Sequence, residues 1–180
     1  MAFPEMIETT RLTLRRPRAS DSGPMAAYAG DKRVAEMLEH LPHPYPPGAA
    51  EAFIERSLRP DAAEHVWIMD ASKGDGAEFI GVIGVKIRMP EPQLGYWVGP
   101  PFWNTGFASE AAVGVVDAVM AAGHTRMTAR VVARNTASAT VLQHAGFVET
   151  GRGAFFSVAA NAMLEHRLFT LDIAATATTA

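Results

Sequence analysis

The sequence contains no cysteine among its 180 residues. A chain without thiols forms no disulfide, offers no thiolate nucleophile and has no cysteine ligand for a metal ion. Histidine gives no strong metal signal either. His40 and His43 stand three residues apart, but Leu41 and Pro42 between them disfavour a helical pair of ligands. We therefore expect no metal site.

Long apolar runs and an excess of basic residues are also lacking. No segment approaches the ~18 to 20 apolar residues of a membrane span, and the opening MAFPEMIETTRL has no basic segment followed by an apolar core. The formal net charge of −3 gives no overall positive field that would attract nucleic acid or anionic lipid. We expect a cytoplasmic protein without a nucleic-acid or membrane partner.

Two nucleotide-binding signatures are missing as well. Neither G-x-G-x-x-G nor G-x-x-x-x-G-K-[ST] occurs, which argues against the usual dinucleotide and nucleoside-triphosphate enzymes. What is present is ordinary for a globular protein, with 48% hydrophobic and 19% charged residues. A chain of this length suits one core. We predict a single domain over residues 1–173 and a frayed tail, AATATTA, at 174–180.

The most informative stretch runs from Gln93 to Ala112 and reads QLGYWVGPPFWNTGFASEAA. It opens as an alternating strand, breaks at Gly99-Pro100-Pro101, turns through WNTG and enters an apolar helix at about Phe107. Unpaired N–H groups and the positive end of the dipole at such a helix start favour an anion such as phosphate. Because most strand-to-helix turns bind nothing, this stretch alone is a weak indicator of function.

Hydrophobic periodicity predicts strands and helices along the rest of the chain. The predicted strands are 11–16, 65–69, 78–88, 93–98, 127–133 and a final pair from 147 onward and at 163–171. The predicted helices are 21–29, 34–41, 50–58, 107–122 and 135–145, with a proline-rich loop at 40–48. Short turns join consecutive strands into an antiparallel meander, and the strand, helix, strand order over 93–133 predicts a parallel crossover. The expected fold class is α/β (α+β) with a mixed, mainly antiparallel sheet.

The same patterns assign faces to three of these elements. On the strand at 78–88, Phe79, Ile83, Val85 and Ile87 should share one face, with Ile80 and Val82 on the other. The helix at 34–41 should be amphipathic, with an apolar face of Val34, Met37, Leu38 and Leu41. The helix at 135–145 should turn Ala137, Val141 and Ala145 toward the core.

Two segments, GYWVGPPFWNTGFASEA and ARVVARNTASATVLQHAGF, together resemble the acetyl-CoA-binding core of the GNAT superfamily of N-acetyltransferases. The opening ETTRLTLRRPRASD is similar to the first strand and helix of the ribosomal-protein-alanine (RimJ/RimL-like) branch. The resemblance therefore covers nearly all of residues 7–171. It implies a sheet splayed to admit acetyl-CoA, helices on both faces and transfer of an acetyl group to a primary amine. Many members of the family pair as homodimers, but the sequence does not decide the oligomeric state of this chain.

The resemblance also implies a set of binding residues. Backbone N–H groups from Asn104 to Ser109 would hold the pyrophosphate, and the strand around Trp97 and Val98 would pair with the pantetheine arm. Asn135 and Ser138 would lie near the arm and the thioester, and they are the catalytic candidates. Without the resemblance, a helix cap and a first-turn serine explain these two residues more simply. The implied binding set is Trp97, Val98, Asn104, Thr105, Gly106, Phe107, Ala108, Ser109, Asn135 and Ser138.

The chain departs from the family pattern at three positions. The family usually has a glycine where Asn104 stands and often a basic residue where Thr105 stands. The binding of the pyrophosphate should therefore be weaker or differently arranged. Many members carry a tyrosine general acid where this chain has Leu142, which leaves that role vacant. We hypothesise that Ser138 donates the proton to the departing thiolate instead.

Without cysteine, an acyl-thioenzyme is excluded, and the simplest route is direct attack of a neutral amine on the thioester. Free amines have pKa values of about 8 to above 10, so a base or a water chain should assist. Residue type alone nominates Glu39, His40 and His65, and the sequence does not decide among them. A strand N–H near Val98 would stabilise the oxyanion.

The acceptor stays open among a protein N-terminus, an aminoglycoside or polyamine, and an amino-acid-like metabolite. The alternative function is a non-catalytic acyl-CoA-binding or sensing module, for which Leu142 in the tyrosine position is the only indication.

Overall fold

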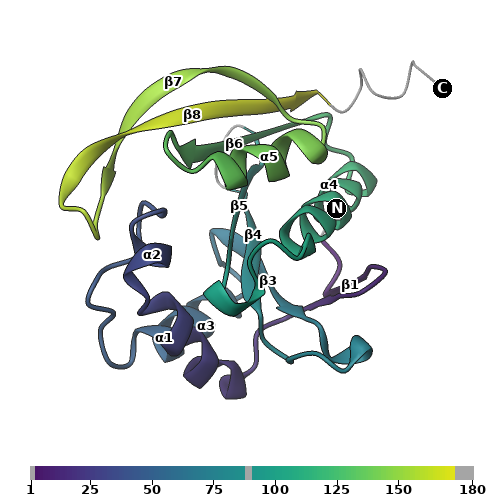
Figure 1. Ribbon diagram of the computed structural model, residues 1–180. Helices are drawn as coiled ribbons and strands as arrows, with labels where there is room; N and C mark the ends of the chain where they lie inside the picture. The colour runs from purple at the N-terminus through teal and green to yellow at the C-terminus, as the bar shows by residue number, and fades with distance from the viewer. Residues whose placement is uncertain (1–2, 88–90, 173–180) are drawn as a thin grey trace.

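The computed structural model describes residues 3–87 and 91–172 (Figure 1). The strands are β1 Met6–Glu8, β2 Thr13–Arg15, β3 Glu64–Asp70, β4 Gly81–Lys86, β5 Gln93–Val98, β6 Arg126–Val132, β7 Val148–Ser157 and β8 Ala162–Asp172. The α-helices are α1 Ser22–Ala29, α2 Lys32–Ala35, α3 Ala49–Ser57, α4 Phe107–Ala121 and α5 Thr136–His144. The predicted tail at 174–180 and the end of the strand predicted at 78–88 lie outside the described residues.

The strands form one eight-stranded sheet in the order β1-β2-β3-β4-β5-β6-β8-β7. All of its neighbouring pairs are antiparallel except β5 and β6, which are parallel and joined through α4. β5 pairs with β6 only at Gln93 with Thr128 and at Leu94 with Ala129, although β5 continues to Val98. The two strands part beyond Leu94. The mixed, mainly antiparallel and splayed sheet is therefore confirmed.

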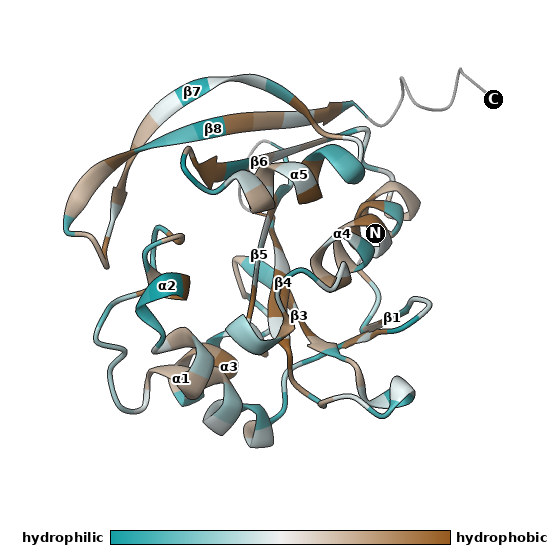
Figure 2. Cartoon of the chain, viewed as in Figure 1, coloured by the Kyte–Doolittle hydropathy of each residue, from teal (hydrophilic) through white to brown (hydrophobic). Residues whose placement is uncertain are grey.

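Helices cover both faces of the sheet (Figure 1). One buried cluster joins the sheet to α4 and α5, and a smaller one joins the opposite face to α1 and α3. The first cluster includes Trp67, Ile83, Val115 and Leu142, and the second includes Met25, Ile54, Ile68 and Val82. Figure 2 shows the consequence, with hydrophobic brown along β3 and β4 at the centre and much teal on the surrounding loops and α2.

The helix predicted at 34–41 is wrong, because α2 covers only Lys32–Ala35. Beyond it, the Met37 N–H donates to Val34 O and the Leu38 N–H to Ala35 O, which is the three-residue spacing of turns. The apolar residues that gave the helical pattern, Val34, Met37, Leu38 and Leu41, line a cavity instead of a core. The spacing of apolar residues in a sequence does not distinguish the wall of a cavity from a packed core.

Two of the predicted faces also need correction. β4 begins only at Gly81, so the period-two alternation does not extend back to Phe79 and Ile80. Phe79 packs with Val82 on the α1 and α3 side, whereas Ile80 belongs to the cluster of α4. In α5, the core residues are Ala139, Leu142 and Ala145, while Val141 is only partly buried and Ala137 is exposed.

A buried ion network joins β2, the start of α1 and β3. The Arg15 side chain is 6% exposed; its two terminal nitrogens each donate to Asp21 at 2.9 Å, and its Nε donates to Asp70 at 2.7 Å. Asp21 stands at the N-cap position of α1, but its side chain is bound to Arg15 and makes no capping hydrogen bond to that helix. Burial alone would raise the pKa of Asp70, but hydrogen bonds from Ser72 and Arg15 outweigh it and lower that pKa.

We predict that Arg15→Leu lowers the free energy of unfolding by about 3 to 5 kcal/mol, because two buried carboxylates lose their shared cation. Urea denaturation at pH 7 measures this loss. Arg59→Leu is the control, since the exposed Arg59–Asp61 pair should contribute less than about 1 kcal/mol. The contribution of Asp70, whose folded pKa is lowered, should be present at neutral pH and be lost as the pH falls below about 4. Equal losses in the two variants would contradict the assignment.

Candidate functional site

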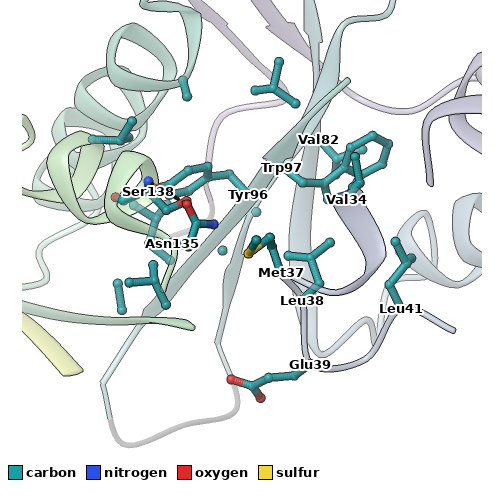
Figure 3. Close-up of a pocket in the computed structure, with 18 of the residues that line it drawn as sticks. Val34, Met37, Leu38, Glu39, Leu41, Val82, Tyr96, Trp97, Asn135 and Ser138 are labelled. Carbon is teal, nitrogen blue, oxygen red and sulfur yellow. Dashed lines mark hydrogen bonds between the residues drawn. The ribbon is translucent and has the colours of Figure 1, made fainter. Parts of the chain in front are cut away.

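A cavity of about 1410 Å³ lies where β5 and β6 part, and residues from both faces of the sheet line it. One half is formed by the end of β5, the first turn of α4 and the first turn of α5. The other half is formed by the segment after α2, by α3 and by side chains of β3 and β4. In Figure 3, Tyr96 lies beside Asn135 and Ser138, whereas Trp97 lies on the other side with Val82 and Val34.

The first turn of α4 presents unsatisfied backbone donors to this cavity. Among the described residues, no side chain caps the helix, and the first intrahelical bond runs from the Glu110 N–H to Gly106 O. The N–H groups that precede Glu110 are therefore left without helical partners. Every residue from Asn104 to Ser109, the turn that the resemblance assigns to the pyrophosphate, lines the cavity. The geometry fits a phosphate, because uncapped donors at a helix start bind anions.

Two residues of this turn have left-handed backbone conformations, Asn104 with φ 60° and Gly106 with φ 81°. Asparagine is among the few residues other than glycine that adopt this conformation readily. Asn104 can thus supply the turn geometry at a position where the family usually has glycine.

Arg11, which the sequence did not identify, reaches this turn from the connection between β1 and β2. Its Nη1 donates to Thr105 O at 2.9 Å, its Nε donates to Glu110 at 2.7 Å, and its guanidinium lies 4.6 Å from the centroid of the Phe107 ring. It brings a positive charge to the turn in which Thr105 replaces a basic residue. The contact was missed because about a hundred residues separate its members, and the local pattern at Arg11 indicated only a strand.

The start of α5 is capped by Asn135, whose Oδ1 accepts a hydrogen bond from the Ser138 N–H at 3.1 Å. The simpler explanation of Asn135 as a helix cap is therefore confirmed. Within the described part of the chain, the Asn135 Nδ2 and the Ser138 hydroxyl have no hydrogen-bond partner, and both residues line the cavity. These two polar groups remain available to a ligand.

Tyr96 links β5 to α5 across the gap. Its hydroxyl donates to Ser138 O at 2.8 Å, and burial raises its pKa above the usual range, so the phenol keeps its proton. Leu142, at the position where the resemblance led us to look for a tyrosine, is fully buried in the core. The tyrosine nearest to Ser138 thus comes from a strand and not from the helix.

The free edge of β5 faces the same gap. The Gly99 N–H donates to Ile80 O at 2.8 Å, so alternate peptide groups, including that of Trp97, point toward β4. The peptide groups of Tyr96 and Val98 therefore point into the gap. Val98 presents its N–H there, while its carbonyl accepts from Trp103 Nε1 at 2.6 Å. Trp97 contributes its side chain to the opposite wall of the cavity.

The three candidate bases have different surroundings. Glu39 lines the cavity, but Arg130 Nη2 donates to its carboxylate at 2.5 Å and His166 Nε2 lies 3.6 Å away. His40 also lines the cavity, and burial together with nearby Lys86 lowers its pKa. His65 packs on the α4 face of the sheet, with its ring centroid 4.4 Å from Trp67 and 5.6 Å from Phe3. Since alternation along β3 turns it away from the cavity, the hypothesis for His65 is wrong.

Comparison with known proteins agrees with this geometry. The model of the acetyltransferase (GNAT) domain matches residues 11–148. The chain belongs to the GNAT acetyltransferase family. It is therefore an acyltransferase, and the resemblance inferred from the sequence is confirmed.

Individual relatives are distant in sequence. The Bacillus licheniformis protein called uncharacterized N-acetyltransferase p20 is 25% identical over 172 residues, covering 93% of this chain and 96% of the relative. RimJ of Mycobacterium smegmatis, solved with CoA-disulfide, has a TM-score of 0.80 at 19% identity and covers 98% of this chain and 90% of its own. Spermidine N-acetyltransferase of Vibrio cholerae, solved with CoA and spermine, has a TM-score of 0.75 at 16% identity, with coverages of 92% and 97%.

Among residues 3–87 and 91–172, no three His, Cys, Asp or Glu side chains are grouped to hold a metal ion. Over the same residues, none of the helices has the length and apolar character that a membrane crossing requires.

We predict that Gly106→Ala weakens coenzyme A binding about tenfold and lowers the free energy of unfolding by about 1 to 2 kcal/mol, because a Cβ strains the left-handed conformation. Calorimetric titration and urea denaturation measure the two effects. Gly123→Ala is the matched control: its φ is 91°, and it follows the other end of α4, outside the cavity. It should lower stability by a similar amount and leave binding unchanged. The idea fails if both variants bind coenzyme A as the wild type does.

Proposed function

We propose that this protein transfers the acetyl group of acetyl-CoA, bound in the gap between β5 and β6, directly to a primary amine. The observation that carries the proposal is that the parted strands and the uncapped start of α4 face one continuous cavity. The gap supplies an extended site for the pantetheine arm, and the helix start supplies donors for the pyrophosphate. Family membership supports an enzyme over a module that only binds acyl-CoA.

In this proposal, the donors that contact the coenzyme have no hydrogen-bond partner within residues 3–87 and 91–172. The N–H groups from Asn104 to Ser109 contact the pyrophosphate, with Arg11 holding the turn in shape. The exposed edge of β5 at Tyr96 pairs with the amide groups of the arm, and the Asn135 Nδ2 donates to a carbonyl of the arm. The Val98 N–H is the donor that we assign to the thioester oxygen.

The chemical step uses the Ser138 hydroxyl as the proton donor to the departing thiolate. Three observations support this role: the hydroxyl makes no hydrogen bond among the described residues, it lies at the start of α5 on the cavity wall, and Leu142 leaves the tyrosine position apolar. Because the chain has no cysteine, the acetyl group passes to the amine without an acyl-thioenzyme.

The first test is thiol release from acetyl-CoA in the presence of a panel of amines. The expected result is amine-dependent release of coenzyme A with formation of the acetylated amine, followed by a thiol reagent and mass spectrometry. A protein that binds coenzyme A by calorimetry but releases no thiol with any amine would be a binding module. Absence of coenzyme A binding up to millimolar concentration would remove the proposal altogether.

The second test concerns Ser138. We predict that Ser138→Ala lowers kcat by about tenfold or more at saturating substrates, since general acid catalysis commonly contributes at least that much. Thr140→Ala is the control on the same helix, because its hydroxyl donates to Thr136 O within the helix. An unchanged kcat in Ser138→Ala would exclude the serine as the acid.

A further inference from the structure

Glu64, at the start of β3, lines the half of the cavity that is formed by α3 and by side chains of β3 and β4. Val66 and Ile68 follow it on the same face of β3 and belong to the cluster of α1 and α3, whereas His65 and Trp67 point to the α4 face. Glu64 itself is only partly exposed and lines the cavity. It therefore lies on the face opposite α4, within the same cavity as the coenzyme turn.

The carboxylate of Glu64 has no hydrogen bond or ion pair within the described part of the chain. Burial raises its pKa above the ordinary value, and nearby Lys86 on β4 offsets this only in part. A carboxylate that has lost water without gaining a partner has a high affinity for a proton or a cation. This surrounding differs from that of Glu39, which is paired with Arg130.

Two glycines connect Glu64 to the point where the sheet splays. A methyl group built on Gly84 would lie 2.8 Å from Glu64 Oε1, so the carboxylate lies directly over Gly84. Gly84 pairs with Gly95 on β5, and Gly95 directly follows Leu94, the last residue of β5 that pairs with β6. A Cβ on Gly95 would have no atom within 4 Å, so this floor is open. Adjacent strands are about 4.8 Å apart, which brings the carboxylate within reach of the splay directly or through one water.

We infer that Glu64 binds the ammonium group of the acceptor and takes its proton before acetyl transfer. The inference rests on the proposed function. One proton passes from the ammonium to the Glu64 carboxylate, and the freed nitrogen lone pair forms the C–N bond with the thioester carbonyl carbon. The C–S bond breaks, and the thiolate receives a proton from Ser138, which regains one from the nitrogen. The products are the amide, coenzyme A thiol and one proton that Glu64 releases to solvent.

The cavity walls also restrict the acceptor class. The basic side chains that line the cavity are Arg33, Arg56, Lys86 and Arg130, and the acidic ones are Glu39 and Glu64. Since Glu39 is already paired, one carboxylate remains to hold one ammonium group. Apolar residues also line this cavity, among them Val34, Met37, Leu41, Phe53, Val66 and Trp97. The acceptor is thus a monoamine with an apolar body, and a polyamine would place its further charges beside arginine and lysine.

The test compares the wild type with Glu64→Gln, which keeps the shape of the side chain, using 2-phenylethylamine and spermine as acceptors. For the wild type, kcat/KM should be at least about tenfold higher with 2-phenylethylamine. Glu64→Gln should lower kcat/KM for that amine by about 100-fold at pH 7.5, and the deficit should shrink toward pH 10 as the free amine forms. Coenzyme A affinity and Tm should not fall. Glu51→Gln, on the exposed side of α3, is the matched charge control and should leave activity unchanged.

The outcomes separate this inference from the proposed function. If the wild type acetylates amines and Glu64→Gln remains within threefold of it, or if Glu39→Gln alone abolishes activity, the assignment of Glu64 is overturned. Preference for spermine overturns the acceptor class. If the wild type releases no thiol with any amine, the proposed function fails, and calorimetry with 2-phenylethylamine in the presence of coenzyme A decides about Glu64. At least about tenfold weaker binding to Glu64→Gln then supports the ammonium site, and equal binding excludes it.

Discussion

The parting of β5 from β6 after a single pair of bridges is the constraint on which the site depends. A parallel pair that continued to Val98 would satisfy the peptide groups of Tyr96 and Val98 and would leave no room between the strands. Because the strands separate, backbone N–H and C=O groups of β5 beyond Leu94 lack a neighbouring strand in the middle of the sheet. Folded domains normally avoid such unpaired backbone groups. The cost is offset by continuous cores on both faces and by the Tyr96 hydroxyl, which connects β5 to α5 across the gap.

The two helix starts beside this gap illustrate opposite uses of the same backbone geometry. In α5, the Asn135 side chain accepts from the Ser138 N–H of the first turn, whereas α4 begins after a left-handed glycine and has no side-chain cap within the described residues. The four N–H groups at any helix start need partners. Where the chain supplies none and orients them into a cavity, a bound anion becomes the natural partner. Arg11 completes this arrangement by holding Thr105 and Glu110, so the turn is fixed before a ligand binds.

Sequence reasoning predicted those features that depend on neighbouring residues. The glycine-containing turn into α4, the Asn135 cap, the crossover and the antiparallel meander of β3, β4 and β5 all follow from local spacing, and the family resemblance implied the splay. It failed where the surroundings decide the outcome. Met37 and Leu38 have the spacing of a helix face, but they line a cavity. Phe79 and Ile80 were assigned to the wrong faces of the sheet because β4 starts only at Gly81. Arg11 and Glu64 carried no local signal, since their significance comes from contacts with residues distant in sequence.

The distribution of charge across the sheet indicates why a single acidic residue can matter so much. Arg15 and Arg130 are each paired with carboxylates. Because both charges of each pair are satisfied, these pairs hold their strands and loops in place and are not available for reaction. Glu64 is different: it has been removed from water by folding, yet Lys86 is the one cation that influences it and makes no ion pair with it within the described residues. A structural carboxylate in that position would be expected to acquire a partner, as Asp21, Asp70 and Glu110 have. An unpaired carboxylate over a floor of two glycines, one strand away from the splay, has the properties of a group whose partner arrives with the substrate.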